Sequence, residues 1–159
     1  MTDLEVRPMK ESDIPTLLEF FNAIVAEGGT TAHEDPFSTA DFHDHYFTQP
    51  AFAFVVLTGS TPVGFQAVFE REPGLYSIGS FTDQRSRVKG AGAALFEATK
   101  AACTAAGGHT IIAKIRADNV PGLAYYSKMG FVDTDRIKGV PLNDGTPMDR
   151  IVKSLPLQS

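Results

Sequence analysis

The stretch from Arg85 to Gly92 constrains this chain most, because it joins a strand-like run to an alanine-rich helix through cations and glycines. The run from Leu75 to Thr82 precedes it, and the segment from Ala93 to Ala106 follows it. Backbone N–H groups at a helix start have no partner within the helix and carry the positive end of its dipole. Glycines let a ligand approach those groups closely. This order of strand, loop and helix predicts a phosphate-binding site.

Length and charge limit the possible partners. The chain has 159 residues, enough for one domain with a full core, so we expect a single domain over residues 1–159. A net charge of −5 argues against nucleic acid as a main partner and against an anionic membrane surface. The cations concentrate locally at Arg85, Arg87 and Lys89, which we interpret as one anion site on an acidic body.

Cysteine and hydropathy narrow the class further. The one cysteine, Cys103, excludes an internal disulfide and a thiolate metal site, and we interpret it as a small core residue. We therefore expect no metal. No apolar run approaches the length of a membrane span, and residues 1–10 are too polar for a secretory signal. We expect a cytoplasmic protein.

Periodicity in the first half of the chain predicts one strand, two helices and an antiparallel meander. The first helix begins at Ser12 or Asp13 and stops at Gly28-Gly29, and a short second helix runs from Ser38 to about Thr48. The predicted strands are Leu4 to Arg7, Phe52 to Thr58, Pro62 to Glu72 and Leu75 to Thr82.

The second half predicts a crossover and a closing hairpin. A long helix from about Gly90 to Ala106 leads to a strand at Thr110 to Ile115, so the strands flanking that helix should be parallel. A further helix, two strands and a turn at Asn143-Asp144-Gly145 follow, the elements spanning 119–128, 131–137 and 148–155. The order is roughly βααβββαβαββ. It predicts a mixed α/β (α+β) fold whose central, mostly antiparallel sheet carries helices on both faces.

Three interpretations of the glycine-rich loop compete. It is not a P-loop, because no Gly-Lys-Ser/Thr stands at the required spacing. It is not a dinucleotide fingerprint, because Leu95 occupies the third glycine position and a meander precedes the loop. A glycine-rich turn without a ligand remains open on the loop alone.

Two motifs together resemble the GNAT superfamily of acetyl-CoA-dependent N-acetyltransferases. Arg87-x-x-Gly90-x-Gly92 is similar to its R/Q-x-x-G-x-G/A motif, and Tyr126-x-x-x-Gly130-Phe131 is similar to its Y-x-x-x-G-F signature. The order of elements resembles that of the family along nearly the whole chain. The resemblance implies a GNAT-like fold, acetyl-CoA as co-substrate and acetyl transfer to an amine.

The resemblance also implies roles for particular residues. The loop N–H groups would hold the pyrophosphate, the end of the preceding strand and Asn119 would contact the pantetheine arm, and Tyr126 would protonate the departing thiolate. The implied cofactor-binding residues are Phe81, Thr82, Arg87, Val88, Lys89, Gly90, Ala91, Gly92, Ala93 and Asn119. A tyrosine can donate as a thiolate forms. The alternative for Tyr126 is a structural role, in which its ring packs against the core and its hydroxyl contacts water. Tyr125 and Tyr126 are adjacent and so lie about 100° apart around the helix axis. We therefore expect only one of these two tyrosines to point into the site.

The chain departs from the family pattern in its loop and in its base. Val88 stands where the first loop glycine is usual, and its β-branched side chain disfavours positive φ. The strand Leu75 to Thr82 contains no carboxylate to deprotonate the amine. The other candidate bases are Glu34, His33, Glu70 and Asp83, and a base acting through water is equally possible.

The loop from Thr30 to Pro36 resembles the acceptor loop of the phosphinothricin and amino-acid N-acyltransferase branch. The resemblance implies Thr31 and Glu34 as substrate residues, although that branch usually has histidine at the position of Tyr126. A small-molecule amine is then the expected acceptor. A protein lysine or N-terminus, and a non-catalytic acyl-CoA-binding domain, are the alternatives. The hairpin at Asn143-Asp144-Gly145 would overhang the acceptor site or pair two subunits, which makes a homodimer possible.

Overall fold

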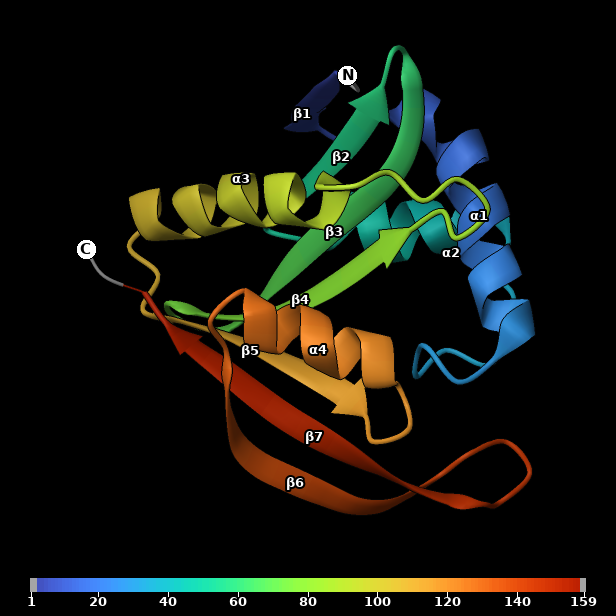
Figure 1. The fold of residues 1–159 in the computed structure, drawn as a ribbon, viewed down its shortest axis with the longest axis vertical. Helices are drawn as coiled ribbons and strands as arrows, with labels where there is room; N and C mark the ends of the chain where they lie inside the picture. The colour runs from blue at the N-terminus through green and yellow to red at the C-terminus, as the bar shows by residue number, and fades with distance from the viewer. Residues whose placement is uncertain (1–2, 158–159) are drawn as a thin grey trace.

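The computed structural model describes residues 3–157 and shows one seven-stranded sheet flanked by helices (Figure 1). The strand order is β1-β2-β3-β4-β5-β7-β6. Along the chain the elements are β1 Leu4–Pro8, η1 Glu11–Asp13, α1 Ile14–Glu27, α2 Thr39–Phe42, η2 His43–Thr48, β2 Phe52–Thr58, β3 Thr61–Glu72, β4 Leu75–Thr82, α3 Ala91–Ala105, β5 Thr110–Arg116, α4 Val120–Lys128, β6 Val132–Pro141 and β7 Pro147–Pro156.

The sheet topology confirms the predicted mixed architecture. Strands β1 to β4 form an antiparallel meander, and β5, β7 and β6 are also paired antiparallel. Strands β4 and β5 are parallel, as the α3 crossover requires. The second predicted helix differs from the expectation. Its α-helical part ends at Phe42 and passes into a π-helical turn, in which the Gln49 N–H donates to the Asp44 carbonyl at 3.1 Å.

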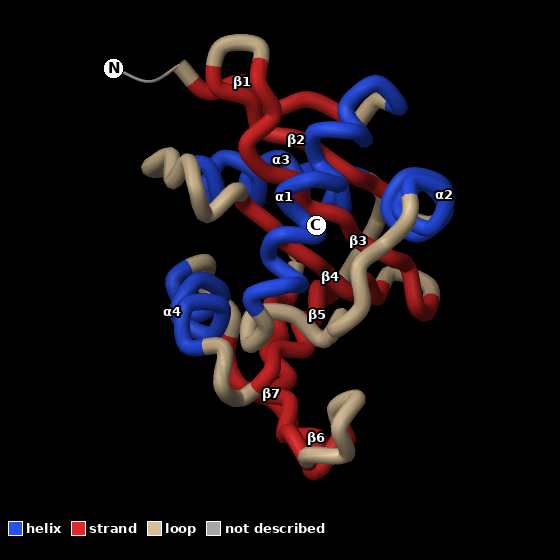
Figure 2. The backbone as a smooth tube through the Cα atoms, turned by 90° about the vertical axis from the view of Figure 1, so that its right-hand side faces the viewer, coloured by secondary structure: helices blue, strands red, loops and turns tan. Residues whose placement is uncertain are grey.

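The helices cover both faces of the sheet, because the strands alternate apolar side chains toward each. Helices α1 and α2 pack on one face around an aromatic core, where Phe21 contacts the rings of Phe42, Tyr46 and Phe81. Helices α3 and α4 pack on the other face against Val56, Val68 and residues of β5 and β7. Figure 2, turned by 90°, shows α2 and α4 on opposite sides of the strands.

Within the described residues, no helix is both long enough and apolar enough to cross a membrane.

Candidate functional site

The parallel pairing of β4 and β5 ends early and leaves a gap in the sheet. Their register covers only Leu75 to Ser77 against Thr110 to Ile112, yet β4 continues to Thr82 and β5 to Arg116. Figure 1 shows the two strands diverging toward their carboxyl ends. Beyond Ser77, the backbone of β4 is therefore not paired with β5 within residues 3–157.

The ladder between β3 and β4 decides which backbone groups face this gap. The Asp83 N–H donates to the Val63 carbonyl at 2.8 Å, so Thr82 and Gly64 form a non-hydrogen-bonded pair. The N–H and C=O of Thr82 consequently point toward β5, and by the same alternation so do those of Ser80. Phe81 turns its backbone to β3 and buries its ring against Phe65 on the α1 face.

The loop after β4 positions the start of α3. Gly90 has φ +86°, a left-handed conformation that favours glycine, and the helix begins at the next residue. Val88 avoids the strain that its side chain would cause, because every residue with positive φ in the described chain is a glycine. It packs instead against the buried cluster of Val56, Val63, Ala91 and Leu95. The substitution of glycine by valine is thus accommodated, and Gly90 makes the sharp turn.

The N–H groups at this helix start are available for an anion. Ala91 and Ala94 donate backward to the carbonyls of Val88 and Gly90, at 3.2 and 3.0 Å. The N–H groups of Gly92 and Ala93 find no backbone acceptor in the part of the chain that the structure describes. These groups carry the positive pole of α3. Unpartnered N–H groups at a helix start are the groups that bind anions in many proteins, and an anion site at this loop stays a prediction.

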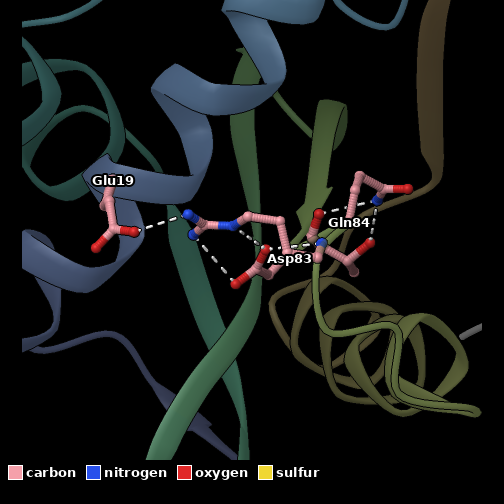
Figure 3. A network of polar contacts seen from close by, with 5 residues as sticks. Glu19, Asp83 and Gln84 are labelled. Atoms are coloured by element: carbon pink, nitrogen blue, oxygen red, sulfur yellow. Dashed lines mark hydrogen bonds and ion pairs between the residues drawn. The ribbon is translucent and has the colours of Figure 1, made fainter.

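The cations of this loop divide into two sets. Arg85 donates to Asp83 at 3.0 Å and to Glu19 of α1 at 2.8 Å, a network in which Figure 3 labels Glu19, Asp83 and Gln84. Arg85, which the sequence groups with Arg87 and Lys89 in one anion site, is thus paired within the protein and connects the loop to α1. Arg87 and Lys89 are exposed and form no ion pair among residues 3–157.

Gln84 covers the exposed end of β4. Its side-chain amide donates to the Thr82 carbonyl at 2.9 Å and to the Thr82 hydroxyl at 3.0 Å (Figure 3). The gap-facing carbonyl of Thr82 thus has an intramolecular partner.

Tyr125 and Tyr126 of α4 both reach a buried polar network beside the gap. The Tyr126 hydroxyl lies 2.8 Å from the Ser80 hydroxyl, and the Tyr125 hydroxyl donates to the Gly92 carbonyl at 2.7 Å. Gln66 of β3 donates to both Ser80 and Tyr125, at 2.8 and 3.1 Å. The expectation that only one of the two tyrosines points inward is wrong, because Ser80 and Gly92 offer partners on either side of Gln66.

The surroundings keep both phenols protonated. Burial raises the pKa of Tyr126, and the hydrogen bond with Ser80 opposes that rise. Burial likewise raises the pKa of Tyr125 to about 12, against hydrogen bonds with Gln66 and Ser80. Each hydroxyl therefore carries its proton at neutral pH and is a donor.

Gly92 allows this arrangement by lacking a side chain. A Cβ there would lie 2.8 Å from Cε1 of Tyr125, closer than real contacts of this kind. The second glycine of the loop is thus required by the packing of Tyr125 as well as by access to the backbone.

The polar loop before α2 is attached to both sides of the gap. Asn119 accepts the Gly122 N–H at 3.0 Å as the N-cap of α4 and donates to the Thr30 carbonyl at 2.9 Å. The Thr31 hydroxyl accepts the His33 N–H at 3.2 Å. Arg116, buried at the end of β5, donates to the Thr31 carbonyl at 3.3 Å and pairs with Asp118. The loop is therefore fixed to α4 and β5.

The C-terminal hairpin lies over the same loop. Both carboxylate oxygens of Glu34 accept the Asn143 N–H, each at 3.0 Å, and Asp35 accepts from the Asn143 side chain at 3.2 Å. A small hollow of about 220 Å³ opens here, lined by Ala32, His33, Glu34, Asp35, Phe37 and Asn143. A larger open hollow of about 1040 Å³ lies between the second half of α3 and β7, and none of the predicted site residues lines it.

His33 lines this hollow and also contacts Tyr46 of the aromatic core. Nε2 of His33 lies 2.8 Å from the Tyr46 hydroxyl. Burial, helped by the charges of His45 and Arg150, lowers the pKa of His33 to about 4, so the imidazole is neutral at pH 7. Burial raises the pKa of Tyr46, and the Tyr126 phenol adds to that rise.

The candidate bases separate clearly in this geometry. Glu70 accepts the Gly74 N–H at the β3–β4 turn. It is paired with Tyr76, which lies six residues, or roughly 20 Å, along β4 from Thr82. Although burial opposes the change, hydrogen bonds from Arg85 lower the pKa of Asp83. Glu34 is hydrogen-bonded to the hairpin. His33 and Glu34 both line the hollow, and of the two only His33 leaves Asn143 unbound and is a neutral imidazole at pH 7.

The titration of His33 predicts a loss of stability in acid. The unfolded histidine has a pKa near 6.5, so as the pH falls the unfolded chain binds the proton first. The contribution of neutral His33 to the free energy of unfolding is present above pH 6.5 and is lost as the pH falls toward about 4. We expect His33→Gln to remove about 1 to 2 kcal/mol of the difference in unfolding free energy between pH 7 and pH 5. Urea unfolding at both pH values measures it, with the exposed His109→Gln as control. An unchanged difference in His33→Gln would contradict the assignment.

Within residues 3–157 no three His, Cys, Asp or Glu side chains gather as a metal site.

Comparisons with known proteins identify the family to which this fold belongs. A model of the acetyltransferase (GNAT) family matches residues 18–131. No curated protein matches the chain. The structure is similar to a phosphinothricin acetyltransferase from Sinorhizobium meliloti in complex with AcCoA, with 22% identity, a TM-score of 0.87 and coverage of 97% of this chain and 88% of the other.

Two further solved structures share the fold. A ribosomal-protein-alanine N-acetyltransferase from Brucella melitensis has 20% identity and a TM-score of 0.84, covering 96% of this chain and 99% of its own. An N-acetyltransferase from Staphylococcus aureus Mu50 has 18% identity and a TM-score of 0.83, covering 98% and 99%.

Proposed function

Because the chain belongs to the GNAT acetyltransferase family, we propose that it transfers an acetyl group from acetyl-CoA to the primary amine of a small molecule, such as an amino acid or an analogue. The observation that carries the proposal is the gap between β4 and β5, which has the free N–H groups of α3 at one end and Tyr126 beside it. A solved structure of the same fold, a phosphinothricin acetyltransferase, is a complex with AcCoA.

Acetyl-CoA would bind along the gap. The pyrophosphate would accept from the backbone of Val88 to Ala93 and from the side chains of Arg87 and Lys89. The amides of the pantetheine arm would pair with the backbone of Thr82 and displace the Gln84 side chain. Asn119, the N-cap of α4, would also contact the pantetheine arm.

The acetyl transfer needs few groups from the protein. The neutral amine attacks the thioester carbonyl, the N–C bond forms, the C–S bond breaks, and the sulfur takes a proton from Tyr126. Solvent receives the amine proton and restores that of Tyr126. A gap-facing backbone N–H of β4 would stabilise the oxyanion. We propose neutral His33, acting directly or through water, as the first acceptor of the amine proton.

Arg87 and Arg85 provide a matched test of the phosphate site. We expect Arg87→Ala to raise the KM for acetyl-CoA about tenfold, since a charge-assisted phosphate contact is lost. Arg85→Ala should leave that KM within about twofold, because the guanidinium is engaged with Asp83 and Glu19. Steady-state kinetics at fixed ionic strength give both values. An equal rise in the two variants would contradict the division of the loop cations.

Glu34 is expected to contribute to binding of the acceptor amine and not to binding of acetyl-CoA. Its carboxylate lines the hollow under the hairpin, and a cationic amine would be attracted there before it loses its proton. We expect Glu34→Gln to raise the KM for the amine about tenfold and to leave the KM for acetyl-CoA unchanged. Asp41→Asn, an exposed carboxylate on α2 that does not line the hollow, is the control. If both KM values rise together, Glu34 supports the loop and does not select the acceptor.

The reaction itself is tested by thiol release. Purified protein is incubated with acetyl-CoA and a panel of free amino acids, their analogues, polyamines and peptides with free N-termini, with a thiol reagent as readout. Cys103 adds little background, because it is buried and burial raises the pKa of its thiol to about 12. We expect release that depends on a small amine. Turnover of peptides alone would assign a protein acceptor, and acetyl-CoA binding without turnover of any amine would refute acetyl transfer.

A further inference from the structure

Gln66 lies at the centre of the buried network beside the gap, although it belongs to the otherwise apolar run from Val63 to Phe69 in β3. Its side chain is fully buried, between Phe65 and Ala67 in the sequence. Gln66 and Ser80 are opposite each other in the register of β3 and β4. The ladder makes this a non-hydrogen-bonded pair, in which side chains approach closely, and the amide nitrogen lies 2.8 Å from the Ser80 hydroxyl.

Donors and acceptors in this network have a determined direction. The Gly92 carbonyl can only accept, so the single proton of Tyr125 is directed to it. The Tyr125 oxygen must then accept, which orients the Gln66 amide with its nitrogen toward Tyr125. The second proton of that nitrogen goes to Ser80, which therefore accepts from Gln66.

The arrangement leaves one polar atom without a partner. Oε1 of Gln66 is buried and has no hydrogen-bond partner among the described residues. An apolar side chain of similar shape would avoid the cost of desolvating this oxygen. The fold keeps the glutamine, so the protons that Gln66 donates have a use beyond packing.

We propose that Gln66 and Ser80 are positioning residues that direct the Tyr126 proton toward the leaving sulfur, a role that rests on the proposed function. Ser80 accepts from Gln66 and donates its own proton to the Tyr126 oxygen. The Tyr126 proton is then free to point into the gap. When the C–S bond breaks, the sulfur takes that proton, and the Ser80 O–H stabilises the phenolate until solvent reprotonates it.

The same network connects the acid to the anion site. Tyr125 receives a proton from Gln66 and donates to the Gly92 carbonyl in the first turn of α3. The position of Tyr126 is therefore coupled, through this chain of side chains, to the helix start that would hold the pyrophosphate.

We call the hydrogen-bonded series Gln66, Ser80 and Tyr126 the relay, and variants of Ser80 and Gln66 test it. We expect Ser80→Ala and Gln66→Met each to lower kcat about tenfold, with the KM for acetyl-CoA within about twofold of wild type. Ser80→Thr, which keeps the hydroxyl, should recover most of the rate. Ser77→Ala, at the paired end of β4, is the matched control and should keep the full rate. Thermal melting and acetyl-CoA titration show whether each variant folds and binds.

A double-mutant cycle separates positioning from a structural role. If Ser80 acts through Tyr126, Ser80→Ala should cost nothing further in a Tyr126→Phe background. An undiminished tenfold loss in that background, or full activity of Ser80→Ala alone, overturns the relay. A wild-type protein without amine-dependent thiol release would overturn the proposed function instead. Loss of rate in Tyr126→Phe with no effect of either partner would overturn the relay alone.

Discussion

Replacing Tyr126 with phenylalanine is expected to lower kcat about 100-fold, while the KM for acetyl-CoA stays within about twofold. The hydroxyl beside Ser80 is the proposed proton donor, and the phenylalanine ring would keep the packing against Phe131. The loss should therefore be confined to the chemical step. Thiol release at saturating amine and acetyl-CoA measures it.

Tyr76→Phe is the control for this variant. Tyr76 is buried in the same core cluster as Tyr126, but it lies at the end of β4 that is paired with β5. Its hydroxyl should not matter for the rate. If Tyr126→Phe retained full kcat, or if Tyr76→Phe lost as much, Tyr126 would not be the acid.

Replacing Gly90 with valine is expected to weaken acetyl-CoA binding by at least about tenfold and to destabilise the fold by about 1 to 3 kcal/mol. A β-branched residue at φ +86° is strained whatever space surrounds it. Relief of the strain would move the N–H groups that follow, at the proposed anion site. Calorimetric titration with acetyl-CoA and thermal unfolding give the two quantities.

Gly107 offers a close match at the opposite end of α3. It has φ +85°, and no atom lies within 4 Å of the position that a Cβ would take, so Gly107→Val should cost a similar amount of stability. It lies away from the helix start and should keep the affinity for acetyl-CoA. Equal losses of affinity in the two variants would mean that Gly90 acts through global stability and not through the shape of the loop.

Local patterns were sufficient to predict the elements and their connections. Alternation and helical periodicity placed the strands, and the crossover through α3 required β4 and β5 to be parallel. The turn at Asn143-Asp144-Gly145 is also present, with the Gly145 N–H donating to the Leu142 carbonyl at 2.9 Å. These features depend on neighbours in the sequence, which is why sequence alone predicts them.

The site depended on contacts that no local pattern contains. Arg85 looked like a phosphate ligand, but Glu19, 66 residues away, engages it. Ser80 and Gln66 were missed because their pairing follows from the register of β3 and β4. One signal was available, since a glutamine in the apolar run from Val63 to Phe69 requires a buried partner.

The early end of the β4–β5 pairing gives this sheet an unpaired margin in its interior. Most sheets have such margins only at their outer strands, where they invite pairing with other chains. Here Gln84 occupies the carbonyl of Thr82, and α1 and α4 flank the opening on either face. A substrate that pairs there acts as a temporary strand that joins the meander to β5. At about 100 times its Kd it should add about 2.7 kcal/mol of stability, so the enzyme is more resistant to unfolding while it is loaded.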